Sequence, residues 1–398
     1  MAPSASIRPQ GRPSTWLVLG ALAVLWLPVF GVWIGSQNAT GTSLLPWLSD
    51  TPYLGALRRS LTLLAWLVGI GMVIGWPTGV WLGLHRFRGR QLFLGSLCLP
   101  LLLPPFLVSI ALSFLRPWLP YAWQDVVDGL PGCILTGCQL VLPMAVASAL
   151  WIASQLTDGE RAAALFAGGP WTLFRYTCRR ACMAVLAATT LAALRVLADP
   201  GPSQIMGYHG VASEVMIAFA SRYDPIQAGQ KALTFSLLLV PLLIPMVWIL
   251  TSNLSNGLAR QESASSSASS RYAPTHAKGC STLATFLALL VFAPVIAGLA
   301  RPLLVPAISG VLAQAIRTLS ESAAVTLFHA AMAGLTATGV GWVLASWAGR
   351  SRTHRSIVLS SALLLLSLPT SLHALGILSI THDLPAALDP ILRGRWRV

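Results

Sequence analysis

The side chains best suited to chemistry gather in one polar stretch, from Gln155 to Cys182, between two long apolar segments. Asp158 and Glu160 supply negative charge there, and the basic residues are Arg161, Arg175, Arg179 and Arg180. Charges of both signs favour ion pairs and charge-assisted hydrogen bonds with a partner, or with lipid phosphates. This is the chemistry of binding, so we expect the stretch to bind a partner on one side of a membrane.

The sequence contains no arrangement of residues typical of catalysis, a metal site or a cofactor site. It lacks a P-loop, an HExxH motif and a nucleophile elbow, so we expect no ATP hydrolysis by the chain itself. The six cysteines form no CxxC unit, and we interpret them as small apolar side chains. We therefore expect no enzyme and no cofactor.

The composition is that of a membrane protein. Hydrophobic residues make up 55% of the 398 residues and charged residues only 10%, so a bilayer must cover most of the surface. The net charge of +14 does not indicate nucleic-acid binding, because the basic residues lie between apolar runs, as topology determinants do. These features predict an all-α polytopic bundle that contacts membrane lipid.

Nine apolar runs are long enough to cross a membrane. They cover residues 16–35, 60–84, 92–115, 132–154, 183–198, 232–251, 281–300, 322–348 and 357–380. If the N-terminus is cytoplasmic, basic residues favour the inner segments by 15 to 8, which supports that orientation. The first run has no clear cleavage site after it, so we expect a retained helix and not a signal peptide.

The two parts of the chain resemble each other. Three features recur at similar offsets, namely Pro28 and Pro294, Arg86 and Arg350, and Pro104 and Pro369, which are 266, 264 and 265 residues apart. Internal repeats are common in transporters. This indicates a duplication whose second copy ends early and lacks its last three helices.

The duplication predicts three regions. Residues 1–252 form a first half with six transmembrane helices, and residues 281–398 form an incomplete second half with three. Residues 253–280 are rich in serine and are expected to form a flexible cytoplasmic linker.

Several residues are candidates for a membrane pathway. Pro104, Pro105, Ser109 and, in the second copy, Pro369 are expected near the midplane, where prolines interrupt helices and can line a path or simply kink a helix. Asp199 follows an apolar run, and an acid at membrane depth is a functional candidate.

Asp199 also has a structural interpretation. It can end a helix at the interface, or pair with Arg195 one turn earlier. In the following segment, Glu214, Asp224 and Arg222 are expected on a solvated outer surface, although contact with a binding protein is an alternative.

Within the polar stretch, local chemistry predicts two short helices joined by a turn. Alanines 162–164 favour a helix that can pack closely on a partner. Residues 168–170 are Gly-Gly-Pro and break that helix. Trp171 and Phe174 are three residues apart, so they share one face of the second helix as apolar anchors.

These residues resemble the membrane subunits of binding-protein-dependent ABC importers, most closely the fused two-half permeases of the ferric-iron type. The similarity lies in the coupling motif, in a proline-rich third helix and in a segment after the loop. It comprises Glu160-Arg161-Ala162-Ala163, Ala167-Gly168, Pro170 to Phe174, Leu99 to Pro105, Val196 to Asp199, and Gly207-Tyr208. Arg161 occupies the position of the usual glutamate, and Ala167 that of the usual glycine.

The resemblance implies a function and partners. It implies a bacterial inner-membrane permease whose residues 158–182 contact a cytoplasmic ATPase subunit, with Glu160, Arg161, Ala162, Ala163, Ala167, Gly168, Trp171 and Phe174 in the contact. It implies a soluble solute-binding protein outside, and ferric iron as cargo, with 2-aminoethylphosphonate, thiamine or another small solute as alternatives. Since one loop engages one ATPase subunit, either a second permease chain completes the assembly, or two copies assemble, or the chain is an inactive or scaffolding relative.

Overall fold

The computed structural model describes residues 15–39, 51–85, 93, 95–96, 103–264, 282, 285–286, 293, 295–298, 300 and 309–367. Across these residues the chain is helical and contains no β-strand. The helices are α1 (Thr15–Ala39), α2 (Thr51–Ile70), the π-helix η2 (Gly71–Gly75), α3 (Trp76–Leu84), α5 (Pro105–Leu115), the short 3₁₀ turn η3 (Arg116–Trp118), α6 (Tyr121–Gln124), α7 (Gly129–Ser154), α8 (Asp158–Leu197), α9 (Pro200–Ile205), α10 (Val211–Ala220), α11 (Pro225–Ala264), α13 (Ser309–Ala348) and α14 (Arg352–Ser367).

Six of the described helices are long and apolar enough to span a membrane. They are Thr15–Val32, Thr51–Leu84, Gly129–Ser154, Asp158–Leu197, Gln227–Leu254 and Ser322–Ala348. The chain is therefore a multi-pass helical membrane protein. Each of the six includes or overlaps one of the nine predicted spans.

The other three predicted spans are described only in part. The 92–115 run contains α5, which starts at Pro105 because Pro104 is extended (φ −64°, ψ 139°). The 281–300 run has only scattered described residues, and the 357–380 run is described as far as Ser367 in α14. The count of nine and the duplication thus stay predictions.

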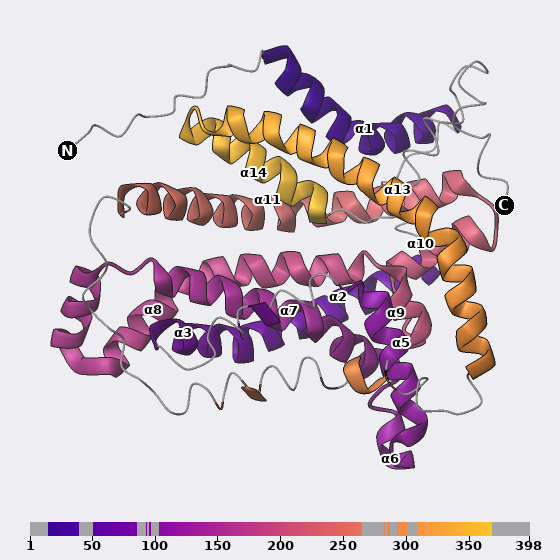
Figure 1. Ribbon diagram of the computed structural model, residues 1–398, viewed down its shortest axis with the longest axis horizontal. Helices are drawn as coiled ribbons and strands as arrows, with labels where there is room; N and C mark the ends of the chain where they lie inside the picture. Colours follow the sequence, from indigo (N-terminus) through magenta and orange to yellow (C-terminus); the bar gives the residue numbers. More distant parts are fainter. Residues whose placement is uncertain are drawn as a thin grey trace.

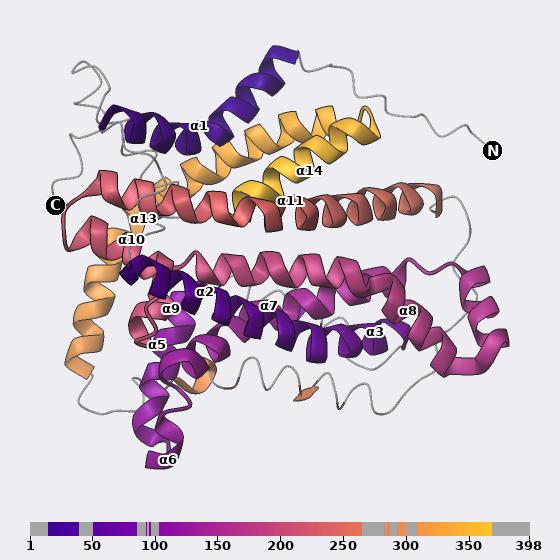
Figure 2. The ribbon, with the colours of Figure 1, turned by 180° about the vertical axis from the view of Figure 1, so that it is seen from behind.

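The helices run side by side, with the two ends of the bundle built differently. α2, α3, α7 and α8 lie next to one another, and α11, α13, α14 and α1 lie on one side of them (Figure 1). The first part of α8 bends away at one end of the bundle, whereas α5, α6, α9 and α10 gather at the opposite end (Figure 2).

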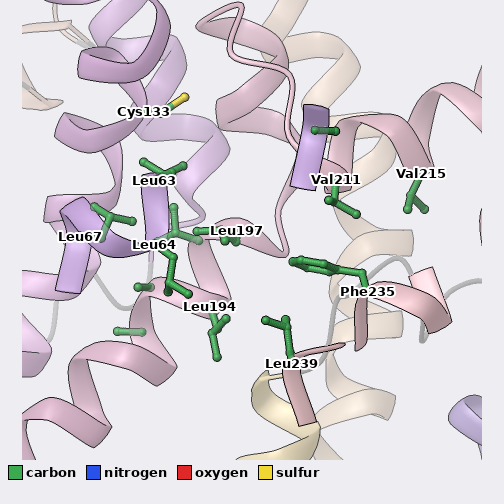
Figure 3. Packing of buried hydrophobic residues seen from close by; sticks show 14 of the residues in the cluster. Leu63, Leu64, Leu67, Cys133, Leu194, Leu197, Val211, Val215, Phe235 and Leu239 are labelled. Carbon is green, nitrogen blue, oxygen red and sulfur yellow. The ribbon is translucent and has the colours of Figure 1, made fainter. Parts of the chain in front are cut away.

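The main core lies where α2, α7, α8, α10 and α11 meet. Figure 3 shows Leu63 and Leu67 of α2 beside Leu194 of α8, with Phe235 and Leu239 of α11 on the other side. All five side chains are buried. This core fixes the C-terminal turns of α8, from Leu191 to Leu197. The polar stretch lies at the other end of the same helix.

A stripe of glycines holds η2 and α3 against α7. Gly71, Gly75, Gly79 and Gly83 recur at every fourth residue and face Val141, Ala145, Ala149 and Ala153, so that each contact joins residues 70 positions apart. The constant offset means that the two helices are parallel. A Cβ on Gly79 would lie 2.7 Å from the Cβ of Ala149, so only glycine permits this approach, as in the small-residue interfaces of membrane helices.

Two helices are longer than their apolar runs. α11 continues to Ala264, so residues 253–264, expected as the start of a flexible linker, are helical. α13 begins at Ser309, 13 residues before the predicted 322–348 span. The hydropathy pattern marks the membrane-embedded part of a helix, but the helix itself continues into polar sequence, in α11 even past Gly257.

Candidate functional site

The polar stretch forms a sharp elbow in α8, which we define as residues 158–182. Gly168 (φ 175°, ψ 24°) and Gly169 (φ 75°, ψ −163°) leave helical geometry and divide the helix into a first leg before them and a second leg after them. Gly169 lies in the left-handed region of φ, which glycine adopts without a Cβ clash. Pro170 then opens the second leg, because its missing N–H is not needed there. The predicted helix break is confirmed.

The first leg begins with a capping box. The backbone N–H of Glu160 donates to Thr157 Oγ1 at 3.2 Å, and the backbone N–H of Thr157 donates to Glu160 Oε2 at 2.9 Å. Two otherwise unpaired helix-end donors are satisfied in this way. The chain therefore enters the elbow in a fixed direction.

An ion pair braces the two legs against each other. Arg180 Nη1 lies 2.6 Å from Glu160 Oε1, and the pair joins residues 20 positions apart. Both side chains are largely covered, so water screens the pair less than it screens an exposed one. Glu160 thus ties Thr157, the first leg and the second leg together.

The charge state of Glu160 follows from these contacts. Partial burial raises the pKa of its carboxyl, but the hydrogen bond from the Thr157 backbone and the Arg180 guanidinium together lower it further. The net pKa lies below the ordinary value for glutamate, so the carboxylate and its brace are present at neutral pH.

Arg161 turns toward the membrane bundle. Its Nη2 donates to the backbone carbonyl of Ala153 at 3.5 Å, near the C-terminal end of α7. A guanidinium is favourable there, because the last carbonyls of a helix are unpaired and carry partial negative charge. The side chain therefore joins the elbow to α7.

The second leg is fixed on α3 by aromatic side chains. Phe174 contacts Trp81 edge to face, with ring centroids 5.9 Å apart. Trp76 Nε1 donates to the carbonyl of Cys178 at 3.2 Å. Trp171 stacks on Phe174 at 5.5 Å, so the two share a face as predicted, but Phe174 is half-buried between Trp171 and α3. Phe174 supports the elbow from inside.

The elbow exposes two large aromatic side chains close to its glycine break. Phe166 is 93% exposed and Trp171 is 69% exposed, on either side of the glycine break. Ala163 and Ala167, one turn apart, are also exposed beside them, and Ala162 is half-buried. The sequence analysis gave Phe166 no role. It is the only aromatic residue of the first leg, and it follows Ala163 by three positions, so the two share one face of a helix.

The pathway candidates lie at the other end of the bundle. Pro104 precedes α5, Pro105 is its first residue, and Ser109 is fully buried. Ser109 Oγ donates to the Pro105 carbonyl at 3.0 Å and lies 3.3 Å from Thr136 Oγ1, so the structure packs it into the helix contact. Pro369 lies outside the described residues.

Asp199 caps a helix. Its Oδ1 accepts the backbone N–H of Gly201 at 2.9 Å at the start of α9, which is the helix-boundary role. It also borders a cavity of about 20 Å³, room for about one water molecule, which Ser60 and Tyr208 help to line. The structure directs the carboxylate to this cap, and the described ion pairs include none with Arg195.

Glu214 does not lie on a solvated surface, so that prediction is wrong. Its carboxylate lies 3.6 Å from Lys231 Nζ, and the two side chains are 16% and 3% exposed. Tyr53 also donates its hydroxyl to the Lys231 carbonyl at 3.2 Å. The sequence alone does not show that α10 folds back onto α11, which is what buries this pair. Asp224, by contrast, accepts the N–H of Gln227 at 2.9 Å near the start of α11.

Two comparisons with known proteins find no relative. Neither a scan against protein-family models nor a search of curated proteins finds a match. Within the described part of the chain, no three His, Cys, Asp or Glu residues gather where they could hold a metal ion.

Proposed function

We propose that this chain is the transmembrane permease subunit of an ATP-driven importer. In this proposal the elbow binds a cytoplasmic ATPase subunit, a solute-binding protein delivers the cargo on the opposite side, and the membrane is the bacterial inner membrane. The N-terminus is then cytoplasmic, and the polar stretch faces the cytoplasm as the distribution of basic residues predicts.

The observation that carries the proposal is the combination of an uncovered apolar tip and a rigid base in one elbow. Exposed aromatic residues next to small residues make a compact docking surface, and aromatic side chains dominate many protein interfaces. Phe166 and Trp171 supply the aromatic part, and Ala163 and Ala167 let a partner approach closely. A loop needed only for topology has no reason to expose them together.

The base of the elbow can transmit force. The Glu160–Arg180 ion pair joins the legs, Arg161 joins the first leg to α7, and Phe174 joins the second leg to α3. α3 in turn packs on α7 through the glycine stripe. A partner that moves the tip therefore moves three membrane helices together.

The cargo is not specified by the elbow. Ferric iron is our first choice from the resemblance to iron-type permeases, followed by 2-aminoethylphosphonate, thiamine or another small solute. Glu214 pairs with Lys231, and Asp199 caps a helix, so neither carboxylate supplies an obvious open binding group for a metal ion.

Co-purification of an ATPase subunit tests the proposal. The tagged chain is solubilised from its native host, and the ATPase subunit is identified by mass spectrometry and quantified per chain. We expect near-stoichiometric recovery with wild type and at least a tenfold loss in the Phe166→Ala, Trp171→Ala double variant.

Trp248→Ala is the matched control. Trp248 is 70% exposed, almost the same as Trp171, but it lies on the membrane-spanning part of α11. Its replacement is expected to leave ATPase recovery unchanged. If the ATPase is absent from the wild-type complex, or if both variants retain it equally, the elbow is not the coupling surface.

A further inference from the structure

Two arginines of the elbow are exposed and have no acidic partner. Arg161 bonds to α7 and Arg180 pairs across the elbow, but no described carboxylate pairs with Arg175 or Arg179. Both side chains are exposed, and the second leg contains no acidic residue. They are four residues apart, so they share one side of the helix. Two positive charges are thus uncompensated on one side of the second leg.

Helix packing gives the level of the bilayer centre on α8. A Cβ on Gly71 would lie 3.0 Å from Val141 Cγ1 and 2.7 Å from Thr189 Cγ2, so α7 and α8 are level at these two residues. Val141 is also in the middle of the 26-residue span Gly129–Ser154. Thr189 therefore marks the bilayer centre on α8.

The two arginines lie at the depth of lipid headgroups. Counted from that centre at 1.5 Å per residue, Arg179 lies at about 15 Å and Arg175 at about 21 Å. The hydrocarbon core of a bilayer ends about 15 Å from its centre, and the headgroup layer ends at about 20–22 Å. Arg179 is thus at the edge of the hydrocarbon, and Arg175 is among the headgroups.

Lipid borders this side of α8. Met183 follows Arg179 by four residues and Arg175 by eight, so it lies within about 80° of both around the helix. It is about 9 Å from the bilayer centre, inside the hydrocarbon, and it is 56% exposed. A large apolar side chain exposed at that depth contacts acyl chains. The headgroup of a lipid that contacts Met183 is therefore within reach of both guanidinium groups.

We infer that Arg175 and Arg179 form a binding site for the phosphate of an anionic lipid. A guanidinium binds phosphate oxygens through two parallel N–H···O bonds, and here neither group has to give up an acidic partner to do so. An anionic headgroup is favoured over a zwitterionic one, because the ammonium of a zwitterionic lipid lies next to its own phosphate and repels the arginines.

Acceptors are scarce at this end of the bundle, which favours an acceptor from outside the chain. Trp151 Nε1, Gln155 Nε2 and Arg161 Nε are buried without a hydrogen-bond partner, on the last turn of α7 and at the start of the elbow. All three are N–H donors. Phosphate oxygens of a phosphodiester only accept, so a lipid supplies the kind of group that the described protein lacks here.

The test measures which lipid borders the site. In a cysteine-free background, the full chain with Met183→Cys carries a fluorophore at position 183 and is placed in phosphatidylcholine bilayers. Phosphatidylglycerol or phosphatidylcholine, each with the same nitroxide on its acyl chain, is added as quencher at the same low mole fraction. The ratio of the two quenching constants measures the local enrichment of the anionic lipid.

Ile244→Cys is the matched control position. Ile244 is 57% exposed, almost the same as Met183, and lies on the membrane-spanning part of α11. We expect an enrichment of at least about fivefold at position 183, which is the factor for one basic residue near a membrane surface. We expect a ratio near one at position 244, and at position 183 once Arg175→Gln and Arg179→Gln are added.

Three outcomes would overturn the inference. The first is a ratio near one at position 183 with both arginines present. The second is an enrichment that persists in the double arginine variant or is equal at position 244. The third is an enrichment that inorganic phosphate removes and potassium chloride of the same ionic strength does not, which would assign the site to free phosphate.

The inference does not rest on the proposed function. By the same count, Trp171 lies about 27 Å from the bilayer centre, beyond the headgroups, so a protein at the elbow tip and a lipid at the arginines do not compete for one place. The quenching measurement needs no ATPase, and co-purification of an ATPase subunit does not report on lipid. Each can fail while the other succeeds.

Discussion

The glycine stripe gives a quantitative prediction for Gly79→Ala. The added Cβ would lie 2.7 Å from the Cβ of Ala149, 2.7 Å from the Val146 carbonyl oxygen and 2.8 Å from the Val146 Cα. Two of these three atoms belong to the backbone of α7, so a change of side-chain rotamer cannot relieve the clash. The helices must separate by about 1 Å to reach an ordinary carbon–carbon distance.

The expected cost follows from that separation. A gap of about 0.5–1 Å removes roughly a quarter to a half of the dispersion energy of each neighbouring contact along the stripe. Overpacking of this kind costs about 1–3 kcal/mol. Alanine also favours a helix over glycine by about 1 kcal/mol, which partly offsets the cost.

Gly69→Ala is the matched control, because it gains the same helix propensity as Gly79→Ala and the comparison cancels that gain. Gly69 lies in α2, in the same continuous helical segment, and a Cβ there has no neighbour within 4 Å. Both variants gain the same propensity, so their difference in unfolding free energy is the packing cost of about 1–3 kcal/mol. Gly79→Ala should therefore unfold at a lower temperature than Gly69→Ala, by about 1–4 °C.

The assay is thermal unfolding of the two purified variants in the same detergent, read as the fraction that stays monodisperse after heating. Unfolding of membrane chains is often irreversible, so the two are compared at one heating rate. Equal midpoints for the two variants would refute the close contact between α3 and α7.

Two further predictions concern ion pairs. Glu160→Gln keeps the capping box but removes the ion pair across the elbow, so the distance distribution between spin labels at Ala163 and Met183 should broaden. Because the pKa of Glu160 is lowered, the wild-type ion pair is complete above the ordinary glutamate pKa and is lost as the pH falls through the lowered value. A wild-type distance distribution that stays narrow at acidic pH would contradict this. So would a narrow distance distribution in Glu160→Gln. Glu214→Gln removes one charged partner of a buried ammonium and should destabilise the chain by about 2 kcal/mol. Adding Lys231→Met should recover part of the loss in the same thermal assay. Equal stability of Glu214→Gln and wild type would show that the pair contributes nothing.

Local sequence predicts the elbow well because its geometry is set by neighbouring residues. Gly168, Gly169 and Pro170 break the helix wherever they occur, and Trp171 and Phe174 share a face in any helix. The role of Phe174 depends on Trp81, which is 93 positions away in the chain. That contact decides which aromatic residue supports the elbow and which is exposed, and no local pattern contains it.

The same division explains the charged residues. The capping box of Thr157 and Glu160 is a local pattern, but the pairing of Glu160 with Arg180 requires the two legs to fold back on each other. Glu214 was expected in solvent because it lies in the outer loop between two predicted spans. The contact between α10 and α11 places it next to Lys231 and covers both.

The sequence analysis did not use the glycine stripe, which shows what a periodic pattern can and cannot tell. Glycines at 71, 75, 79 and 83 form one row on any helix, which predicts close packing with another helix. The pattern does not name the partner, since small residues at four-residue spacing also occur in α13. The register with Val141 to Ala153 emerges only when α7 is placed beside α3.

The shape of α8 bears on where a movement of the elbow would act. From Pro170 to Leu197 its second leg is one helix, with a length of about 40 Å at 1.5 Å per residue. Its far end leads directly to Asp199, which caps α9 and borders the small cavity beside Ser60 and Tyr208. Because a packed helix shifts as a rigid body more readily than it bends, force on Trp171 would be felt at that cap. If the elbow binds an ATPase subunit, a movement of the elbow is therefore expected to reach the Asp199 cap at the far end of the same helix.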